Sequence, residues 1–209
     1  MTKPSLTSVQ TRSRLQLILL AVLFIAPFTA AYVAFYLVPG WAPQGRLNYG
    51  QLINPARPMP VVALRDEEGR PVAEDLLRGK WTLLQIVRRD CDAQCLREVI
   101  LTRQTRAVMG RDDRRVRRLL LAAPGVDLAA IKARFGREQP DLHYAQEALA
   151  APFATPLFAE APDNAILVLD PIGNWLMMYP PYADEQGLEH DFKGIQKDLK
   201  NLLKLSHIG

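Results

Sequence analysis

The feature that most constrains this chain is a stretch of 24 residues, Leu15 to Val38, that contains no charged side chain. A helix rises about 1.5 Å per residue, so roughly 20 apolar residues cross a hydrocarbon core of about 30 Å. Tyr32, Tyr36 and Trp41 gather toward the C-terminal end of the stretch. Such amphipathic rings favour the membrane interface. We therefore predict a single transmembrane anchor over residues 15–38.

The charges that flank the anchor predict its orientation. Lys3, Arg12 and Arg14 precede the apolar stretch, and basic residues tend to stay on the cytoplasmic side. We expect residues 1–14 to be cytoplasmic and the rest of the chain to face the periplasm, or an equivalent extracytoplasmic space, from the inner membrane. A cleaved signal peptide is the alternative, with Thr29-Ala30-Ala31 as its cleavage site. The apolar run continues past that site, which favours an anchor that is not cleaved.

A proline-rich segment separates the anchor from the remaining residues. We interpret residues 39–60 as a semi-extended tether that keeps the following domain near the bilayer. Its five prolines are Pro39, Pro43, Pro55, Pro58 and Pro60. Residues 61–209 are long enough to bury one hydrophobic core and are expected to form a single domain.

The order of elements after the tether predicts the fold class. The pattern favours a β-hairpin near residues 61–72, followed by strands at 81–87 and 116–122, each with a helix after it. A second hairpin made of residues 165–169 and 174–179 follows, and a final helix covers residues 187–205. Residues 137–162 are not resolved by pattern, apart from a short edge strand at His143 and Tyr144. Parallel strands need crossovers, and we expect helices on both faces of the sheet. The prediction is an α/β, thioredoxin-like fold with an N-terminal β-hairpin, preceded by one transmembrane helix.

The only two cysteines of the chain, Cys91 and Cys95, follow the apolar strand 81–87 directly. Side chains four residues apart on a helix point the same way, so both sulfurs reach one spot. A Cα separation of about 6 Å permits a disulfide, and it also lets two thiolates hold one soft metal ion. A helix N-terminus and the neighbouring Arg88 and Arg89 favour a reactive thiolate. A buried inert pair or a purely stabilising disulfide remains the alternative, because the expected compartment is oxidising.

With these motifs, the chain from about Met59 onward resembles the SCO/SenC family of membrane-anchored copper proteins that act in cytochrome c oxidase assembly. The resemblance rests on the anchor, the entry hairpin, the Cys-x3-Cys spacing, the sequence Asp170-Pro171-Ile172-Gly173-Asn174 and the final helix rich in lysine and leucine. It implies that Cys91 and Cys95 are both the catalytic and the metal-binding residues. They would bind copper, deliver it, or reduce a disulfide in a partner's copper site, with a respiratory oxidase subunit or another assembly protein as the partner.

Two departures mark the chain as a divergent member. Leu96 stands where the family has a proline after the second cysteine. The family's third copper ligand is a histidine before the late hairpin, whereas residues 161–165 contain none. Asp163 and Asn164 lie there, and hard oxygen ligands suit copper(I) poorly. His143 is a weak candidate for the missing ligand. Thiol–disulfide exchange needs only the two sulfurs, so the departures weaken the metal interpretation more than the redox one.

A short segment, residues 111–118, carries five arginines. It is either a solvated helix face and loop or a docking surface for an acidic partner or anionic lipid head groups. Nucleic acid is not an expected partner for a domain on the far side of a membrane. A second function hypothesis follows, in which the domain is a non-catalytic, membrane-tethered scaffold that binds a respiratory assembly partner through this segment.

Overall fold

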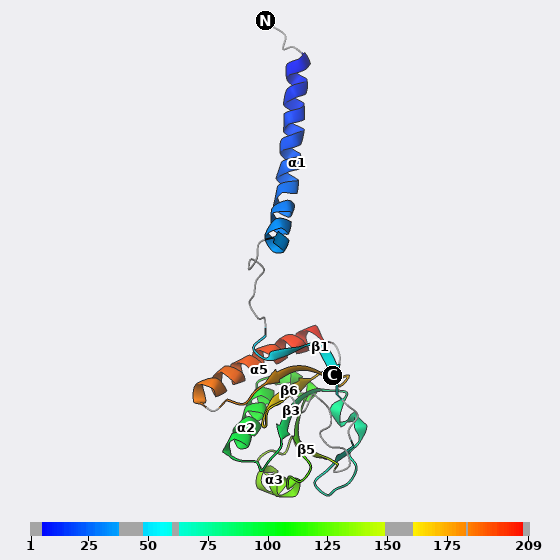
Figure 1. Ribbon diagram of the computed structural model, residues 1–209, viewed down its shortest axis with the longest axis vertical. Helices are drawn as coiled ribbons and strands as arrows, with labels where there is room; N and C mark the ends of the chain where they lie inside the picture. The colour runs from blue at the N-terminus through cyan, green and yellow to red at the C-terminus, as the bar shows by residue number, and fades with distance from the viewer. Residues whose placement is uncertain (1–5, 38–47, 60–62, 149–160, 183, 207–209) are drawn as a thin grey trace. The chain divides into compact units, whose positions relative to one another are not determined.

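The computed structural model describes residues 6–37, 48–59, 63–148, 161–182 and 184–206, in two units that divide between residues 47 and 48 (Figure 1). The first unit contains helix α1 (Leu6–Leu37). Its portion Ser13–Leu37 is long and apolar enough to cross a membrane. A signal sequence near the N-terminus has the same length and apolar character. Residues 15–37 of the predicted segment therefore lie on one continuous helix, and Val38 lies outside the described residues.

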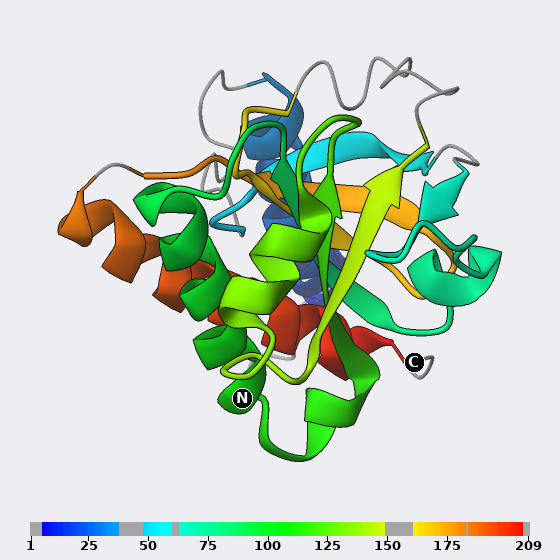
Figure 2. The same ribbon diagram turned by 90° about the horizontal axis from the view of Figure 1, so that it is seen from below.

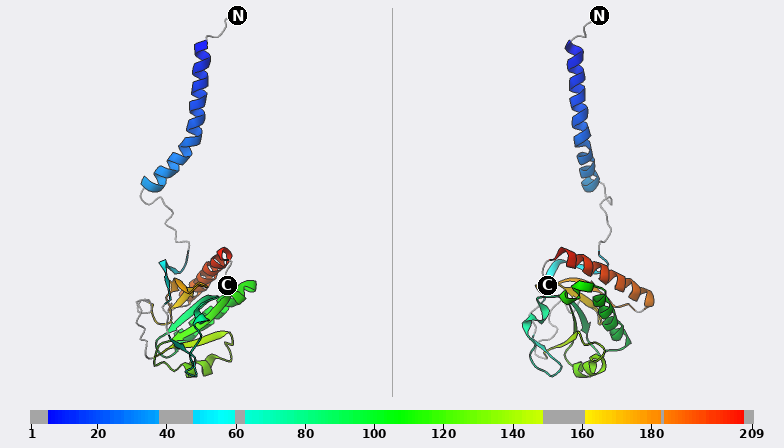
Figure 3. Two further views of the ribbon diagram at one scale, coloured as in Figure 1. Left: turned by 90° about the vertical axis from the view of Figure 1, so that its right-hand side faces the viewer. Right: turned by 180° about the vertical axis from the view of Figure 1, so that it is seen from behind.

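Helix α1 contains a proline and bends along its length (Figure 3). Pro27 lacks a backbone N–H and leaves a carbonyl of the preceding turn without its usual donor. The hydroxyl of Thr29 donates to the carbonyl oxygens of Ile25 and Ala26, at 3.2 and 3.0 Å. These are local bonds of a threonine hydroxyl to its own helix, and they do not reach the carbonyl of Leu23, which is the one that Pro27 deprives of a donor.

The second unit is built on one sheet of seven strands in the order β1-β7-β6-β3-β4-β5-β2. The strands are β1 (Gln51–Pro58), β2 (Leu64–Arg65), β3 (Trp81–Val87), β4 (Val116–Ala122), β5 (Leu142–Glu147), β6 (Ile166–Leu169) and β7 (Asn174–Tyr179). The β3–β4 and β4–β5 pairs are parallel and the others antiparallel. All seven residues of β3 are buried, as expected for a strand covered on both faces.

The helices of this unit are α2 (Ala93–Ala107), α3 (Leu128–Phe135) and α5 (Glu185–Leu205), with two short 3-10 turns, η1 (Glu74–Leu77) and η2 (Gly110–Arg115). Each α-helix begins after an aspartate whose carboxylate accepts a hydrogen bond from a backbone N–H of the first turn. These N-caps are Asp92, Asp127 and Asp184. Because the cap supplies an acceptor to a backbone donor that the helix leaves unpaired, it determines where each helix starts.

All three α-helices pack on the same face of the sheet (Figure 2). The strands β3, β4 and β5 follow one another in one direction, so two right-handed crossovers place α2 and α3 on one side. The expectation of helices on both faces was therefore wrong for the described residues. The opposite face is covered by η1 and by partly buried apolar side chains, among them Met59, Val72 and Leu76.

The N-terminal part of the domain begins earlier than predicted. Strand β1 lies within the range 39–60 that the sequence suggests is a tether, and it pairs with β7 from the other end of the chain. The compact unit starts at Asn48. The predicted hairpin is present as a bridge between Arg65 and Pro71, although residues 61 and 62 lie outside the described part.

A buried carboxylate fastens this entry point to the last helix. Asp198 of α5 is 3% exposed and accepts hydrogen bonds from the backbone N–H groups of Tyr49 and Gly50, at 2.8 and 2.9 Å. It also accepts from the Tyr179 hydroxyl of β7 at 2.5 Å. One side chain therefore joins the first residues of the domain to β7 and α5.

A second buried charge lies under α2. The guanidinium of Arg118 in β4 is fully buried and binds the Asp141 carboxylate at 2.9 Å. It also donates to the carbonyl of Val99 at 2.6 Å and to the side chain of Gln139 at 3.1 Å. Arg106 binds the second oxygen of Asp141 at 2.7 Å. This network holds α2 to the strand beneath it.

We predict that Asp141→Asn lowers the free energy of unfolding by about 3 kcal/mol, because it leaves the Arg118 cation buried without its counter-charge. Urea unfolding of the full chain in mild detergent, followed by tryptophan fluorescence, measures the change. Glu138→Gln removes an exposed charge nearby and should change the stability by less than about 0.5 kcal/mol. Equal effects of the two variants would refute the role of the network.

Candidate redox site

Cys91 and Cys95 form a disulfide with a Cα–Cα distance of 5.0 Å. Cys91 lies in the turn between β3 and α2 and is 7% exposed, whereas Cys95 lies in the first turn of α2 and is fully buried. The convergence of the two sulfurs, which the spacing predicted, is confirmed. Both residues are therefore buried, and Cys91 keeps the small remaining exposure of the pair.

The start of α2 positions both cysteines. Asp92 caps the helix by accepting a hydrogen bond from the backbone N–H of Cys95 at 3.0 Å. Cys91 therefore precedes the cap and is not itself helical, so the pair spans the helix start instead of occupying one helix face. The unpaired N–H groups and the dipole of a helix N-terminus stabilise a thiolate formed there by reduction.

Gln85, in the middle of β3, faces the covered sulfur. Its side chain is 2% exposed. Its amide nitrogen donates to the carbonyl of Cys95 at 3.0 Å and lies 3.6 Å from the Cys95 sulfur. The sequence analysis did not identify this residue. The feature of the sequence that could have identified Gln85 is its long polar side chain inside a strand that is otherwise almost wholly apolar.

Charged and polar groups from three segments surround the turn. Asp163 accepts hydrogen bonds from the backbone N–H of Arg88 at 2.8 Å and from the side chain of Arg89 at 3.1 Å. Arg134 of α3 donates to the carbonyl of Cys91 at 3.1 Å. These contacts hold the turn between the segment before β6 and helix α3.

A site with three copper ligands does not fit these residues. Asp163 occupies the position where the resemblance implies a histidine, and its carboxylate is already bound by Arg88 and Arg89. His143 lies on β5 between Leu142 and Tyr144, which pack in the same cluster as the disulfide. Neighbouring residues of a strand face opposite sides, so His143 points to the other face of the sheet. Within the described ranges, no group of three histidine, cysteine or acidic residues is arranged to hold a metal ion.

Two buried carboxyl groups lie between α2 and α5. Glu98 is 2% and Asp191 5% exposed. Burial, together with the nearby Asp191 charge, raises the pKa of Glu98 to about 7. Burial likewise raises the pKa of Asp191 to about 6, and the adjacent His190, 3.6 Å away, opposes the shift. Neither group was recognised in the sequence, because isolated acids on amphipathic helices are usually exposed.

The comparisons with known proteins agree with this geometry. Residues 81–206 match the protein family described as "Transmembrane-like, thioredoxin-like, C-terminal domain". The chain belongs to this family. The matched segment runs from β3 through α5 and contains the disulfide and its surroundings. Among curated protein sequences, none matches the chain significantly.

Several solved structures share the fold. Apo Sco1 from Thermus thermophilus superposes with a TM-score of 0.57 at 18% identity and covers 76% of this chain and 99% of its own. ScoI from Arabidopsis thaliana, solved with copper bound, gives 0.54 at 14% identity, with 76% and 99% covered. A thiol:disulfide interchange protein from Bacteroides gives 0.50 at 13% identity, with 68% and 88% covered. At these identities the similarity establishes a thioredoxin-like fold with extra N-terminal strands.

We predict that Gln85→Leu lowers the reduction potential of the Cys91–Cys95 pair by about 30 mV. The amide stabilises the reduced form by a hydrogen bond to the Cys95 thiolate, and a bond of about 1.4 kcal/mol corresponds to that shift. Equilibration with glutathione buffers measures the potential. Gln104→Leu, an exposed position on α2, is the matched control. A potential that is unchanged in Gln85→Leu would contradict the assignment.

The buried acids predict a pH dependence of stability. The pKa of Glu98 is raised from its ordinary value of 4.5 to about 7 in the folded state. The folded state therefore binds this proton more tightly, and the stabilisation present at low pH is lost as the pH rises through about 7. We expect Glu98→Gln to gain stability relative to the parent between about pH 5 and about pH 8, measured by urea unfolding. The exposed Glu138→Gln should give a constant difference, and parallel curves for Glu98→Gln would refute the prediction.

Proposed function

We propose that this protein is an SCO-like, membrane-anchored factor of cytochrome c oxidase assembly that acts by thiol–disulfide exchange. The observation that carries the proposal is the Cys91–Cys95 disulfide at the start of α2, in which Cys91 is 7% exposed and Cys95 is fully buried. Cys91 precedes the helix cap and keeps the remaining exposure of the pair, so its sulfur is the one that a partner would reach first in an exchange reaction. The Cys95 sulfur would act afterwards from within the helix.

In the proposed reaction the reduced domain donates two electrons. The Cys91 thiolate attacks one sulfur of a partner disulfide, which forms a mixed disulfide and releases the other partner sulfur as a thiolate. The Cys95 thiolate then attacks the Cys91 sulfur, and the second partner sulfur leaves. The partner disulfide becomes two thiols, while the domain dithiol becomes the Cys91–Cys95 disulfide. A dithiol reductant on the same side of the membrane returns the domain to its reduced form.

The surroundings of the disulfide support these roles. The N-terminus of α2 favours the Cys91 thiolate electrostatically, and Gln85 offers a donor to the Cys95 sulfur. The guanidinium of Arg88 donates to the carbonyl of Ala161 next to the turn, whereas that of Arg89 is paired with Asp163. We propose that α1 remains as an uncleaved anchor and that the domain faces the periplasm. The partner would be a respiratory oxidase subunit or another assembly protein, whose copper-site thiols must be reduced before they can bind metal.

Copper delivery is the less favoured form of the proposal. The reduced cysteines would supply two soft ligands to copper as a cargo. The third ligand expected from the resemblance is a histidine, but residues 161–165 contain none, and the Asp163 carboxylate there accepts from the Arg88 backbone N–H and the Arg89 side chain. We therefore assign the exchange reaction to the pair and derive no step through copper.

A trapping experiment tests the proposal. With Cys95→Ser, the Cys91 thiol should form a mixed disulfide with its partner that is not resolved, which is seen as a reducible adduct on a non-reducing gel and identified by mass spectrometry. The matched Cys91→Ser variant should trap at least about tenfold less, because the Cys95 sulfur is buried. An oxidase subunit or assembly protein in the adduct supports the oxidase role. If neither variant traps a partner and the double variant assembles active oxidase normally, the domain is a scaffold instead.

A further inference from the structure

One side of helix α5 is lined with lysines. Lys193, Lys197, Lys200 and Lys204 are all exposed, and their spacing of four, three and four residues keeps them on one side of the helix. The opposite side packs on the sheet through Ile195, Leu199 and Leu203. The lysines therefore form a continuous basic surface, which we call the α5 lysine face.

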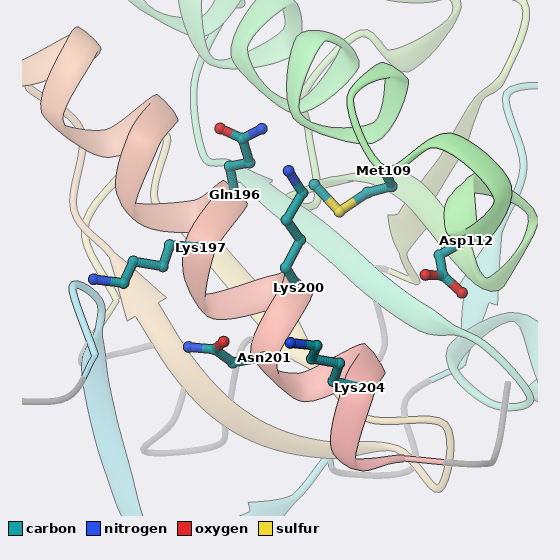
Figure 4. Close-up of a pocket in the computed structure, with 7 residues that line it drawn as sticks. All are labelled: Met109, Asp112, Gln196, Lys197, Lys200, Asn201 and Lys204. Atoms are coloured by element: carbon teal, nitrogen blue, oxygen red, sulfur yellow. The ribbon is translucent and has the colours of Figure 1, made fainter.

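The α5 lysine face borders a hollow between α5 and the end of α2 (Figure 4). The hollow has a volume of about 520 Å³ and is lined by Met109, Asp112, Gln196, Lys197, Lys200, Asn201 and Lys204. In Figure 4 the side chain of Lys200 extends from α5 toward Met109. Three ammonium groups and two side-chain amides at one hollow are donors suited to an anion.

The acids near the hollow do not neutralise it. The Asp112 carboxylate binds Arg115 at 3.1 Å. Lys193 pairs with Glu189 at 2.5 Å, and the Lys197 ammonium lies 5.1 Å from the centre of the Tyr49 ring. Lys200 and Lys204 have no acidic partner among the residues that the structure describes. Their charges are therefore available to a ligand from outside the domain.

The segment 111–118, which the sequence suggested as a docking surface, contributes less to such binding. Arg118 is buried with Asp141, and Arg117 donates to the carbonyl of Leu76. Arg115 donates to the carbonyls of Leu203 and Ser206, at 3.1 and 2.6 Å. Three of the five arginines thus support the fold, and the basic surface is carried mainly by α5.

The chain itself indicates what lies opposite the α5 lysine face. The domain is entered at Tyr49, whose ring lies beside Lys197. Ten residues, 38–47, separate the end of α1 from Asn48, where the compact unit begins. Fully extended, they span at most about 35 Å. A surface next to the entry point is therefore held within a short distance of any bilayer that contains α1, at a high effective concentration of lipid head groups.

An exposed apolar side chain adjoins the lysines. Leu205, which follows Lys204 at the end of α5, is 84% exposed. Basic residues with a neighbouring apolar side chain suit the boundary between head groups and acyl chains. An acidic protein surface would use the charges but has no particular need for an exposed leucine at this position.

We propose that the α5 lysine face binds the anionic phospholipid head groups of the bilayer in which α1 is embedded. The proposal rests on the proposed uncleaved anchor but not on the chemistry of the cysteines. It gives the domain a docked orientation on the membrane, with α5 against the lipid. Each lysine at an anionic surface strengthens the association about fivefold.

Lysine labelling in lipid nanodiscs tests the proposal. The full chain is inserted in discs of phosphatidylcholine alone or of phosphatidylcholine with phosphatidylglycerol, and it is pulsed with an amine-reactive reagent and analysed by mass spectrometry. Lys197, Lys200 and Lys204 should label at least about fivefold more slowly in the anionic discs, and the effect should vanish at high salt. Lys80, which is exposed outside α5, should label equally in both discs.

A charge variant provides the second arm. Lys197→Gln/Lys200→Gln/Lys204→Gln should abolish the lipid-dependent protection of the remaining Lys193, whereas the control Lys80→Gln/Lys132→Gln should retain it. Equal labelling of the α5 lysines in the two kinds of disc would overturn the proposal and leave an acidic protein as the occupant. Because the trapping experiment depends on Cys91 and Cys95 alone, failure here would not affect the proposed exchange reaction.

Discussion

The burial of strand β3 is the constraint on which the rest of the domain depends. It pairs with β4 on one side and β6 on the other, and all seven of its residues are covered. Its parallel partner can only be reached by a crossover, so the chain must leave the carboxyl end of β3 through a turn and enter a helix. Cys91 and the cap of α2 lie in that turn. The location of the disulfide is therefore a consequence of how the central strand is buried.

Buried polar side chains lie between the sheet and the helices that cover it, and each makes a different interaction. Arg118 joins β4 to α2 through Asp141 and a backbone carbonyl, which contributes to stability. Gln85, on the neighbouring strand, donates to the carbonyl of Cys95 and approaches its sulfur. Glu98 lies between α2 and α5, where its pKa is raised by burial. Because the Gln85 amide is uncharged, it can affect the reduction potential of the cysteine pair without placing a charge in the core.

Local sequence signals predicted the central part of the fold well and its margins poorly. Apolar runs and helical periodicity predicted β3, β4 and the α-helices α2, α3 and α5, because those signals are local. Strand β1 was missed because Pro55 and Pro58 resemble a tether, although prolines are tolerated in an edge strand. Its partner β7 is distant in sequence, as Asp163 is from Arg88, and single-sequence patterns do not report such pairings. For the same reason the site could be located from the cysteine spacing, but Gln85 and Arg134 could not be assigned to it.

The attachment made by Asp198 has a mechanical consequence. A pull on residues 38–47 would load the hydrogen bonds from Tyr49 and Gly50 to this carboxylate, and through it the helix α5 and strand β7. The turn that holds Cys91 belongs to β3 and α2, which are not in that line of force. A force applied through that segment would therefore reach α5 and β7 first and leave the geometry of the sulfur pair unchanged.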